Sequence, residues 1–195
     1  MEKSNINSTS GIALQNQWCA DNPLPKTEND TLRMLFCRQD NVAISLNDTL
    51  YKLRNGNILI AFPGDVMNIT GYGQSFSGSY LSVSLKLLEQ FSLFSPQNWK
   101  TYSTIKGGQQ LCLEEYNVQI LQSYLNLLEI RSNHPSLVDN NAGLHSLIYI
   151  FIRDFLNIAS KRQGKPKCLE LSAANSLLNR FIHLLYASVP QKQTL

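Results

Sequence analysis

Residues that would build an active site are scarce in this sequence. It has three histidines, all in its second half: His134, His145 and His183. Between residues 31 and 84, where short apolar runs predict strands, there are only three carboxylates, all at predicted turns: Asp40, Asp48 and Asp65. A metal site in a small barrel needs several histidine and carboxylate ligands that converge from neighbouring strands. We therefore expect no bound metal, no cofactor and no enzymatic activity.

The signatures of other catalytic classes are missing too. No serine lies in a GxSxG sequence, and no GxGxxG or phosphate-binding loop is present. The four cysteines are far apart and form no CxxC pair: Cys19, Cys37, Cys112 and Cys168. None has a histidine nearby, so we expect buried, unreactive thiols in a reducing compartment.

Charge and long apolar runs are also scarce. The net charge is only +3, which does not indicate a nucleic-acid surface by itself. The one basic cluster, residues 161–167, includes Gly164 and Pro166 and is typical of a solvated linker. No run of about 18 apolar residues occurs, and the first residues lack the apolar core of a signal peptide. These features predict a cytoplasmic protein.

Short strands are the main signal between residues 31 and 84. Leu32, Met34 and Phe36 alternate with Arg33, Leu35 and Cys37, and similar runs follow at spacings near ten residues. The six predicted strands fall within residues 31–37, 42–46, 49–53, 57–62, 66–70 and 79–84. Turn signals separate them at Gln39-Asp40-Asn41, Asn47-Asp48, Asn55-Gly56 and Pro63-Gly64-Asp65. This pattern predicts an antiparallel barrel or sandwich.

After residue 84 the apolar spacing becomes helical. A short helix is predicted over residues 85–94, with Ser84 as its N-cap. The next helix is predicted to end near Asn133, and its apolar stripe consists of Leu113, Tyr116, Ile120, Tyr124, Leu127 and Leu128. A third helix covers residues 144–158, and a last one carries apolar residues between 177 and 185.

The helix at 144–158 is apolar around more of its circumference than a single packed face requires. Either it is fully buried within one subunit, or the surplus meets a partner, and we favour a homodimer with two-fold symmetry. The residues predicted for this interface are Leu144, Leu147, Ile148, Phe151, Ile152 and Phe155.

The stretch YKLRNGNILIAFPGD, residues 51–65, resembles the cupin domain of AraC-type transcription regulators. In that family a strand enters a glycine turn, runs through an apolar strand and meets a Pro-Gly pair. The hairpin at 34–46 resembles the first barrel strands of the family, and residues 80–91 look like its last strand and first helix. The helical half resembles a Bacteroides-like subgroup, in which residues 179–185 would lead into the DNA-binding domain.

The resemblance implies an α+β fold in which a small antiparallel cupin-like β-barrel precedes a helical dimerisation segment. The expected organisation is an irregular arm over 1–30, the barrel over 31–84, helices over 85–189 and the start of a linker over 190–195. Metal-binding cupins carry a histidine shortly after the Pro-Gly pair, where this chain has Val66-Met67-Asn68. The helix-turn-helix domain is expected to follow Leu195, so DNA would be bound only through that domain.

A ligand-sensing and dimerisation domain is therefore the predicted function. The alternatives are a metal-dependent cupin enzyme and a stand-alone small-molecule-binding module. A small-molecule effector would lie inside the barrel, with Arg38 as its polar anchor. Its predicted site consists of Phe36, Arg38, Ile44, Leu46, Ile60, Phe62 and Tyr80. Core packing alone would also place these apolar residues inside.

Overall fold

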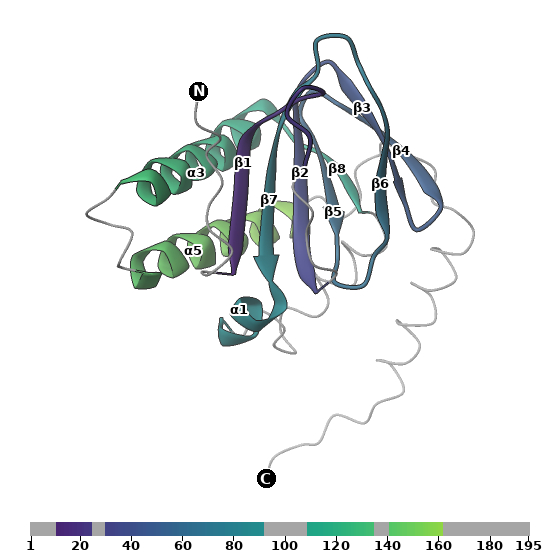
Figure 1. Ribbon diagram of the computed structural model, residues 1–195. Coiled ribbons are helices and arrows are strands. Elements are labelled where there is room, and N and C mark those ends of the chain that lie inside the picture. The colour runs from purple at the N-terminus through teal and green to yellow at the C-terminus, as the bar shows by residue number, and fades with distance from the viewer. Residues whose placement is uncertain (1–10, 25–29, 92–108, 135–140, 162–195) are drawn as a thin grey trace.

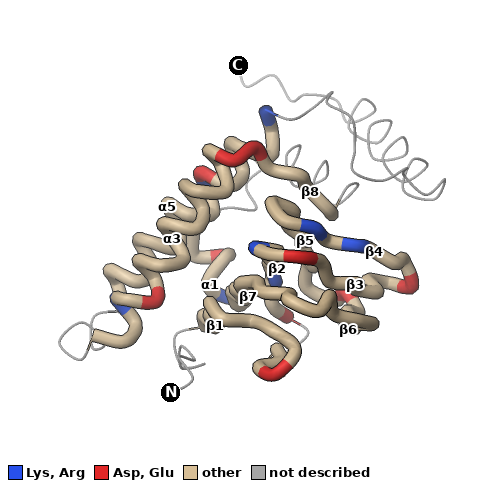
Figure 2. The backbone as a smooth tube through the Cα atoms, turned by 90° about the horizontal axis from the view of Figure 1, so that it is seen from above, with Lys and Arg blue, Asp and Glu red and all other residues tan. Residues whose placement is uncertain are grey.

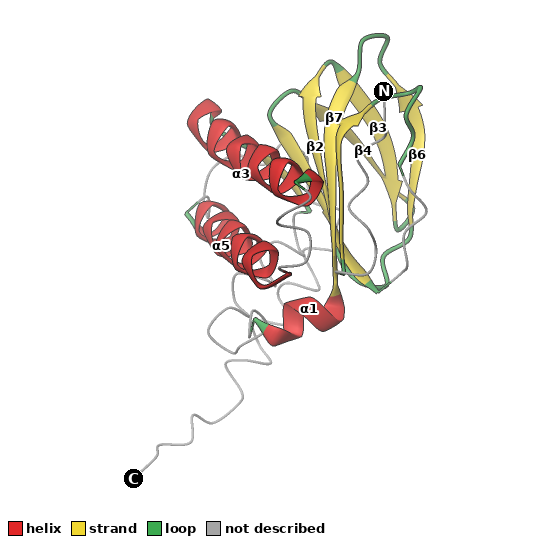
Figure 3. Ribbon diagram, turned by 60° about the vertical axis from the view of Figure 1, so that its left-hand side comes forward, coloured by secondary structure: helices red, strands yellow, loops and turns green. Residues whose placement is uncertain are grey.

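The described part of the molecule has three layers. The computed structural model describes residues 11–24, 30–91, 109–134 and 141–161. A five-stranded sheet forms the middle layer, with two long helices on one face and a three-stranded sheet on the other (Figures 1 and 3). None of the described helices is long and apolar enough to cross a membrane.

All the strand pairs are antiparallel. The middle sheet has the order β1 (Ile12–Trp18), β7 (Ser77–Ser84), β2 (Thr31–Gln39), β5 (Asn57–Ala61) and β8 (Gln110–Cys112). The smaller sheet has the order β4 (Thr49–Arg54), β3 (Asn41–Leu46) and β6 (Met67–Tyr72). The α+β class is confirmed. Within the described residues the two sheets stay separate, whereas the sequence predicted a barrel.

The predicted turns form where residues that tolerate positive φ allow them. Asn47 and Asp48 have φ of 48° and 62°, which suits the two-residue hairpin between β3 and β4. Gly56 has φ of 77° between β4 and β5, and Gly64 has φ of 87° after β5. These left-handed positions fix the register of the hairpins, and each was visible in the sequence.

Strand β2 divides the core into two clusters. Met34 and Phe36 face the helices, whereas Leu35 and Cys37 face the smaller sheet, and all four are buried. Successive side chains of a strand point to opposite faces, so a strand buried on both sides is apolar at nearly every position. The side chains of β2 therefore alternate between two faces as predicted, but both faces are buried in the core.

The helices are α1 (Leu85–Gln90), α3 (Glu115–Asn133) and α5 (Asn141–Ser160). The predicted cap at Ser84 is confirmed, because its hydroxyl accepts a hydrogen bond from the Leu87 N–H. The predicted stripe of α3 is only partly right: Leu128 is buried as predicted, but the other buried residues of the helix are Leu121 and Leu125. Tyr116 is 72% exposed and Leu127 is 50% exposed. Apolar side chains lie on several sides of α3, so spacing alone did not identify the packed face.

Two strands lie outside the predicted barrel segment. β1 falls in the supposedly irregular arm, and β8 falls in the supposedly helical half. The alternation of β1 is hidden because Gln15 and Asn16 are both buried polar residues. β8 has only three residues, which is too short for a periodic signal. The predicted helix at 177–185 and the linker at 190–195 lie outside the described residues.

Trp18 anchors one end of the space between the sheets. It is fully buried and packs edge-on against Phe76, with ring centroids 4.7 Å apart. Its indole N–H points to the Tyr72 hydroxyl at 3.4 Å. Gly78 lies directly beneath this ring, on β7. A Cβ atom there would lie 2.6 Å from the Phe36 carbonyl oxygen and 2.9 Å from the Trp18 ring.

We predict that Gly78→Ala destabilises the fold by about 2 kcal/mol, because the methyl group would meet backbone and packed rings that cannot move away. Gly71→Ala on β6 is the matched control, since nothing lies within 4 Å of the Cβ that it would add. Urea unfolding followed by tryptophan fluorescence measures both. Equal stability of the two variants would contradict this packing.

Candidate ligand site

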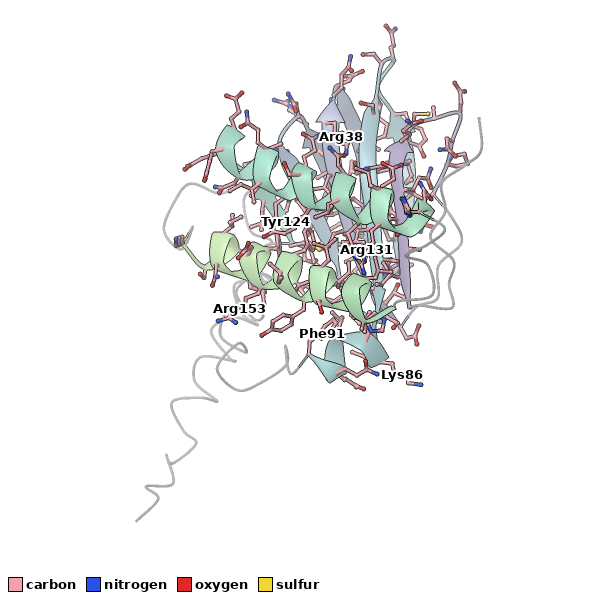
Figure 4. The ribbon with its side chains drawn as sticks, turned by 90° about the vertical axis from the view of Figure 1, so that its left-hand side faces the viewer. Arg38, Lys86, Phe91, Tyr124, Arg131 and Arg153 are labelled. Carbon is pink, nitrogen blue, oxygen red and sulfur yellow. The ribbon has the colours of Figure 1, made fainter. Side chains whose placement is uncertain are left out.

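The structure separates the seven predicted site residues. Three lie between the two sheets, in the inner cluster: Ile44, Leu46 and Tyr80. Three others lie on the helix-facing side of the middle sheet: Phe36, Ile60 and Phe62. The prediction that all six apolar residues face the interior is therefore wrong for the last three. Arg38 also lies on the helix side, beneath α3 (Figure 4).

A hollow lies between α3 and the middle sheet. Its lining comes from β2, the β4–β5 turn, β5, the segment between β8 and α3, and α3. The lining residues are Phe36, Cys37, Arg38, Gly56, Asn57, Ile58, Leu113, Val118, Gln122 and Leu125. Its empty volume is about 280 Å³, which includes its opening to solvent, but its walls leave little room for a molecule between them. The enclosed part has room for one or two water molecules. A larger molecule would enter only if α3 moved outward.

A buried amide joins Arg38 to α3. The Asn16 side chain, which is 4% exposed, accepts hydrogen bonds from Arg38 at 2.7 Å and from the Ser79 hydroxyl at 3.0 Å. Its amide nitrogen donates to Glu129 at 2.7 Å and to Asn126 at 3.2 Å. Both donors and both acceptor sites of the amide are thus used. Asn16 ties β2 and β7 to the C-terminal half of α3.

Arg38 carries its charge in a half-buried position. Burial lowers the pKa of its guanidinium below the ordinary value, and the nearby Glu129 carboxylate offsets part of that effect. Among the described residues its Nε atom is buried and has no hydrogen-bond partner. The hollow therefore has one strong donor group at its edge and mainly apolar walls.

Sequence reasoning missed a second arginine, Arg33, which faces the space between the sheets. It is 4% exposed, and it donates to the backbone oxygen of Asp65. The Asp65 carboxylate accepts hydrogen bonds from Phe62 N–H, Gln109 and Asn47, each at 2.7 Å. Burial raises the pKa of Tyr51, and the Asp65 charge adds to that shift. The sequence did point to this position, because Arg33 occupies an odd-numbered place in β2. Its side chain therefore points to the same face of the strand as Leu35 and Cys37.

The other candidate chemistry is limited in the described residues. No three His, Cys, Asp or Glu side chains gather there in a way that could hold a metal ion. Burial raises the pKa of the Cys37 thiol to about 11, so this thiol is protonated at neutral pH. It contacts the backbone oxygens of Gln39 and Asp40 and serves as a packed core residue.

The predicted interface residues of α5 lie in the core of one chain. Buried there, against the helix face of the middle sheet, are Leu144, Ile148, Phe151, Ile152 and Phe155, with Leu147 partly buried beside them. Phe151 packs on Phe36 of β2 with ring centroids 6.4 Å apart. The surplus apolar surface of α5 thus meets the sheet. In this arrangement a second subunit could not reach the five buried side chains.

Neither a protein-family model nor a curated protein matches the sequence. Among solved structures, the AraC-like transcriptional activator CuxR matches at 12% identity with a TM-score of 0.47. The match covers 94% of this chain and 64% of CuxR. An apo variant of ToxT from Vibrio cholerae matches at 9% identity with a TM-score of 0.49, covering 94% of this chain and 67% of ToxT.

The cupin domain of Schizosaccharomyces pombe Cnp3 matches a smaller part of the fold. It shares 13% identity with a TM-score of 0.33, over 47% of this chain and 66% of that domain. The aligned part of the chain spans less than two thirds of the length of CuxR. These identities and TM-scores are too low to assign the chain to a family.

We predict that Asn16→Ala destabilises the domain by about 2–3 kcal/mol, because it removes the hydrogen bonds that Arg38, Glu129 and Ser79 make with a buried amide. Gln17→Ala is the control, since Gln17 is the exposed neighbour of Asn16 on β1 and its loss should change stability by less than about 0.5 kcal/mol. Chemical denaturation of both variants tests the role of the amide. A neutral Asn16→Ala would show that these hydrogen bonds do not hold α3.

Proposed function

We propose that the chain is the ligand-sensing and dimerisation part of an AraC-type transcription regulator that acts in the cytoplasm. The resemblance of residues 51–65 to the cupin domain of that family is supported by the turns and strands which these residues form. DNA would be contacted by a domain expected after Leu195. The charges of the described residues agree with that division of labour, since Lys and Arg are spread over several elements (Figure 2).

The feature that supports ligand sensing best is the hollow under α3, because this helix is the most weakly attached layer. Only Leu121, Leu125 and Leu128 of its 19 residues are buried. α5 buries many more of its side chains: Leu144, Ile148, Phe151, Ile152, Phe155 and Ala159. Elements with few buried apolar contacts open at lower free energy than the rest of a domain. A ligand between α3 and the sheet would therefore act on the element that moves most easily.

Movement of α3 would be passed to α5. The Tyr124 hydroxyl of α3 donates to the Asp154 carboxylate of α5 at 2.5 Å, and the Tyr124 ring packs edge-on against Phe151. The hydrogen bond to Asp154 raises the pKa of Tyr124 above its ordinary value, so the phenol keeps donating into the alkaline range. A ligand that favours one position of α3 would shift the population of that position. The position of α3 and α5 would then depend on whether a ligand occupies the hollow.

A thermal-shift screen of small metabolites, followed by hydrogen exchange of each hit, tests the sensing function. We expect at least one hit that protects amides of α3 and of the hollow, with the shift lost in Val118→Trp, which fills the hollow. Val66→Trp is the control, because Val66 is 64% exposed and lies away from the hollow. Hits that protect only other regions, or the absence of any hit, would contradict sensing at this place.

The homodimer remains part of the proposal, with a different surface from the predicted one. The large apolar residues that α3 and α5 expose are Tyr116 (72% exposed), Ile130 (64%), Leu127 (50%) and Ile150 (47%). They belong to α3 and α5, so a second copy that packs on them would sense the position of α3 directly. Large exposed apolar side chains on one layer are typical of an interface.

We predict that Ile130→Glu converts a dimer to a monomer in sedimentation at micromolar concentration, because a carboxylate would be buried in the interface. Leu50→Glu is the matched control: Leu50 is 62% exposed on β4, on the smaller sheet. A wild-type monomer, or a dimer that survives Ile130→Glu and dissociates with Leu50→Glu, would place the interface elsewhere or remove it.

A further inference from the structure

The polar groups of the hollow are few, and one of them already has three of its four hydrogen-bonding positions occupied. The Asn57 carboxamide oxygen accepts hydrogen bonds from Arg54 N–H at 3.1 Å and from Gln110 at 2.8 Å. Its nitrogen donates to the Cys112 sulfur at 3.4 Å. Asn57 is therefore committed to the turn before β5. The polar side chains of the lining that are not committed to this turn are Arg38 of β2 and Gln122 of α3.

Arg38 is arranged to bind an acceptor. Its terminal nitrogen NH2 is held by Asn16 at 2.7 Å, which fixes the plane of the guanidinium. Its Nε atom is buried without a hydrogen-bond partner among the described residues. A guanidinium has five N–H donors and no acceptor, and its best partner is a planar carboxylate that takes two of them. An acceptor at this edge would satisfy a donor that the fold has already removed from water.

The charge around Arg38 limits the guest to one negative charge. Glu129 lies close enough to influence Arg38 electrostatically, and both are joined through Asn16. A dianion such as phosphate would bring two charges to a site where one cation already faces one carboxylate. The walls favour a guest with an apolar body, because they are formed by Phe36, Ile58, Leu113, Val118 and Leu125.

From these features we propose that the hollow binds a small organic monocarboxylate, with its carboxylate on Arg38 and its apolar part between β5 and α3. This inference rests on the proposed sensing function and names the ligand class for the same site. The space in the present arrangement holds only water, so a ring or short chain must displace α3. Binding and the movement of α3 are then one event.

Matched acid and amide probes test the proposal: benzoate against benzamide, and hexanoate against hexanamide, at constant ionic strength. NMR titration of the wild-type chain should show that an acid binds at least ten-fold more tightly than its amide. The resonances that shift should belong to residues 36–38, 56–58 and 118–125. Equal affinity of acid and amide, or shifts confined to other residues, would overturn the proposal.

Three variants distinguish the role of the Arg38 charge in binding from an effect on stability. Arg38→Gln should remove the preference for the acid, whereas Arg54→Gln, at an exposed arginine of β4, should keep it. Val118→Trp keeps Arg38 and should abolish binding by filling the hollow, which leaves a test if Arg38→Gln is unstable. Acid binding that survives Arg38→Gln or Val118→Trp contradicts the proposal. If the acids fail while a neutral metabolite protects α3, the ligand class is wrong and the sensing function stands.

Discussion

Burial of both faces of strand β2 is the constraint on which the rest of the structure depends. Its neighbours β5 and β7 pair with it on either side, so the strand has neither an exposed face nor an exposed edge along most of its length. One face needs a second sheet, and the other needs helices. The three layers follow from this requirement, because a sheet that is apolar on both sides must be covered on both sides.

The two helices that cover the sheet do so with different chemistry. α5 covers it with closely packed apolar side chains, of which Phe151 contacts Phe36 of β2. α3 adds a narrow apolar contact and a polar one, through Asn16, to the edge strand β1. Satisfied buried amides specify one arrangement with little net stabilisation. α3 is therefore positioned accurately but held weakly, as a helix that responds to a ligand must be.

The sequence predicted the positions of turns better than it predicted which side of a strand or helix is packed against what. Turns at Asn47-Asp48 and Asn55-Gly56 were found because positive φ restricts the residue types that can occupy them. The side that each residue of β2 and β5 faces could not be found, since both faces of each strand are apolar and buried. Phe36, Ile60 and Phe62 were consequently assigned to the wrong side. The packed face of α3 was found only in part, at Leu128, because apolar residues lie on several sides of that helix.

The apolar residues of α5 were assigned to a dimer interface because the number of strands in the middle sheet was underestimated. Buried Gln15 and Asn16 concealed β1, and three residues were too few to reveal β8. A barrel limited to residues 31–84 has little surface to bury a broadly apolar helix, and a partner then explains the surplus. With β1 and β8 added, the middle sheet has five strands and covers α5 within one chain.

Native-state hydrogen exchange of the unliganded chain tests most directly whether α3 is the weakly held layer. The amides of α3 between Leu121 and Leu128 should exchange through a partial opening, at a free energy clearly below that of global unfolding. Those of β2, β7 and the centre of α5 should exchange only at the global value. Exchange of α3 at the same free energy as β2 would mean that helix and sheet open as one unit, and the account of a ligand-responsive α3 would be wrong.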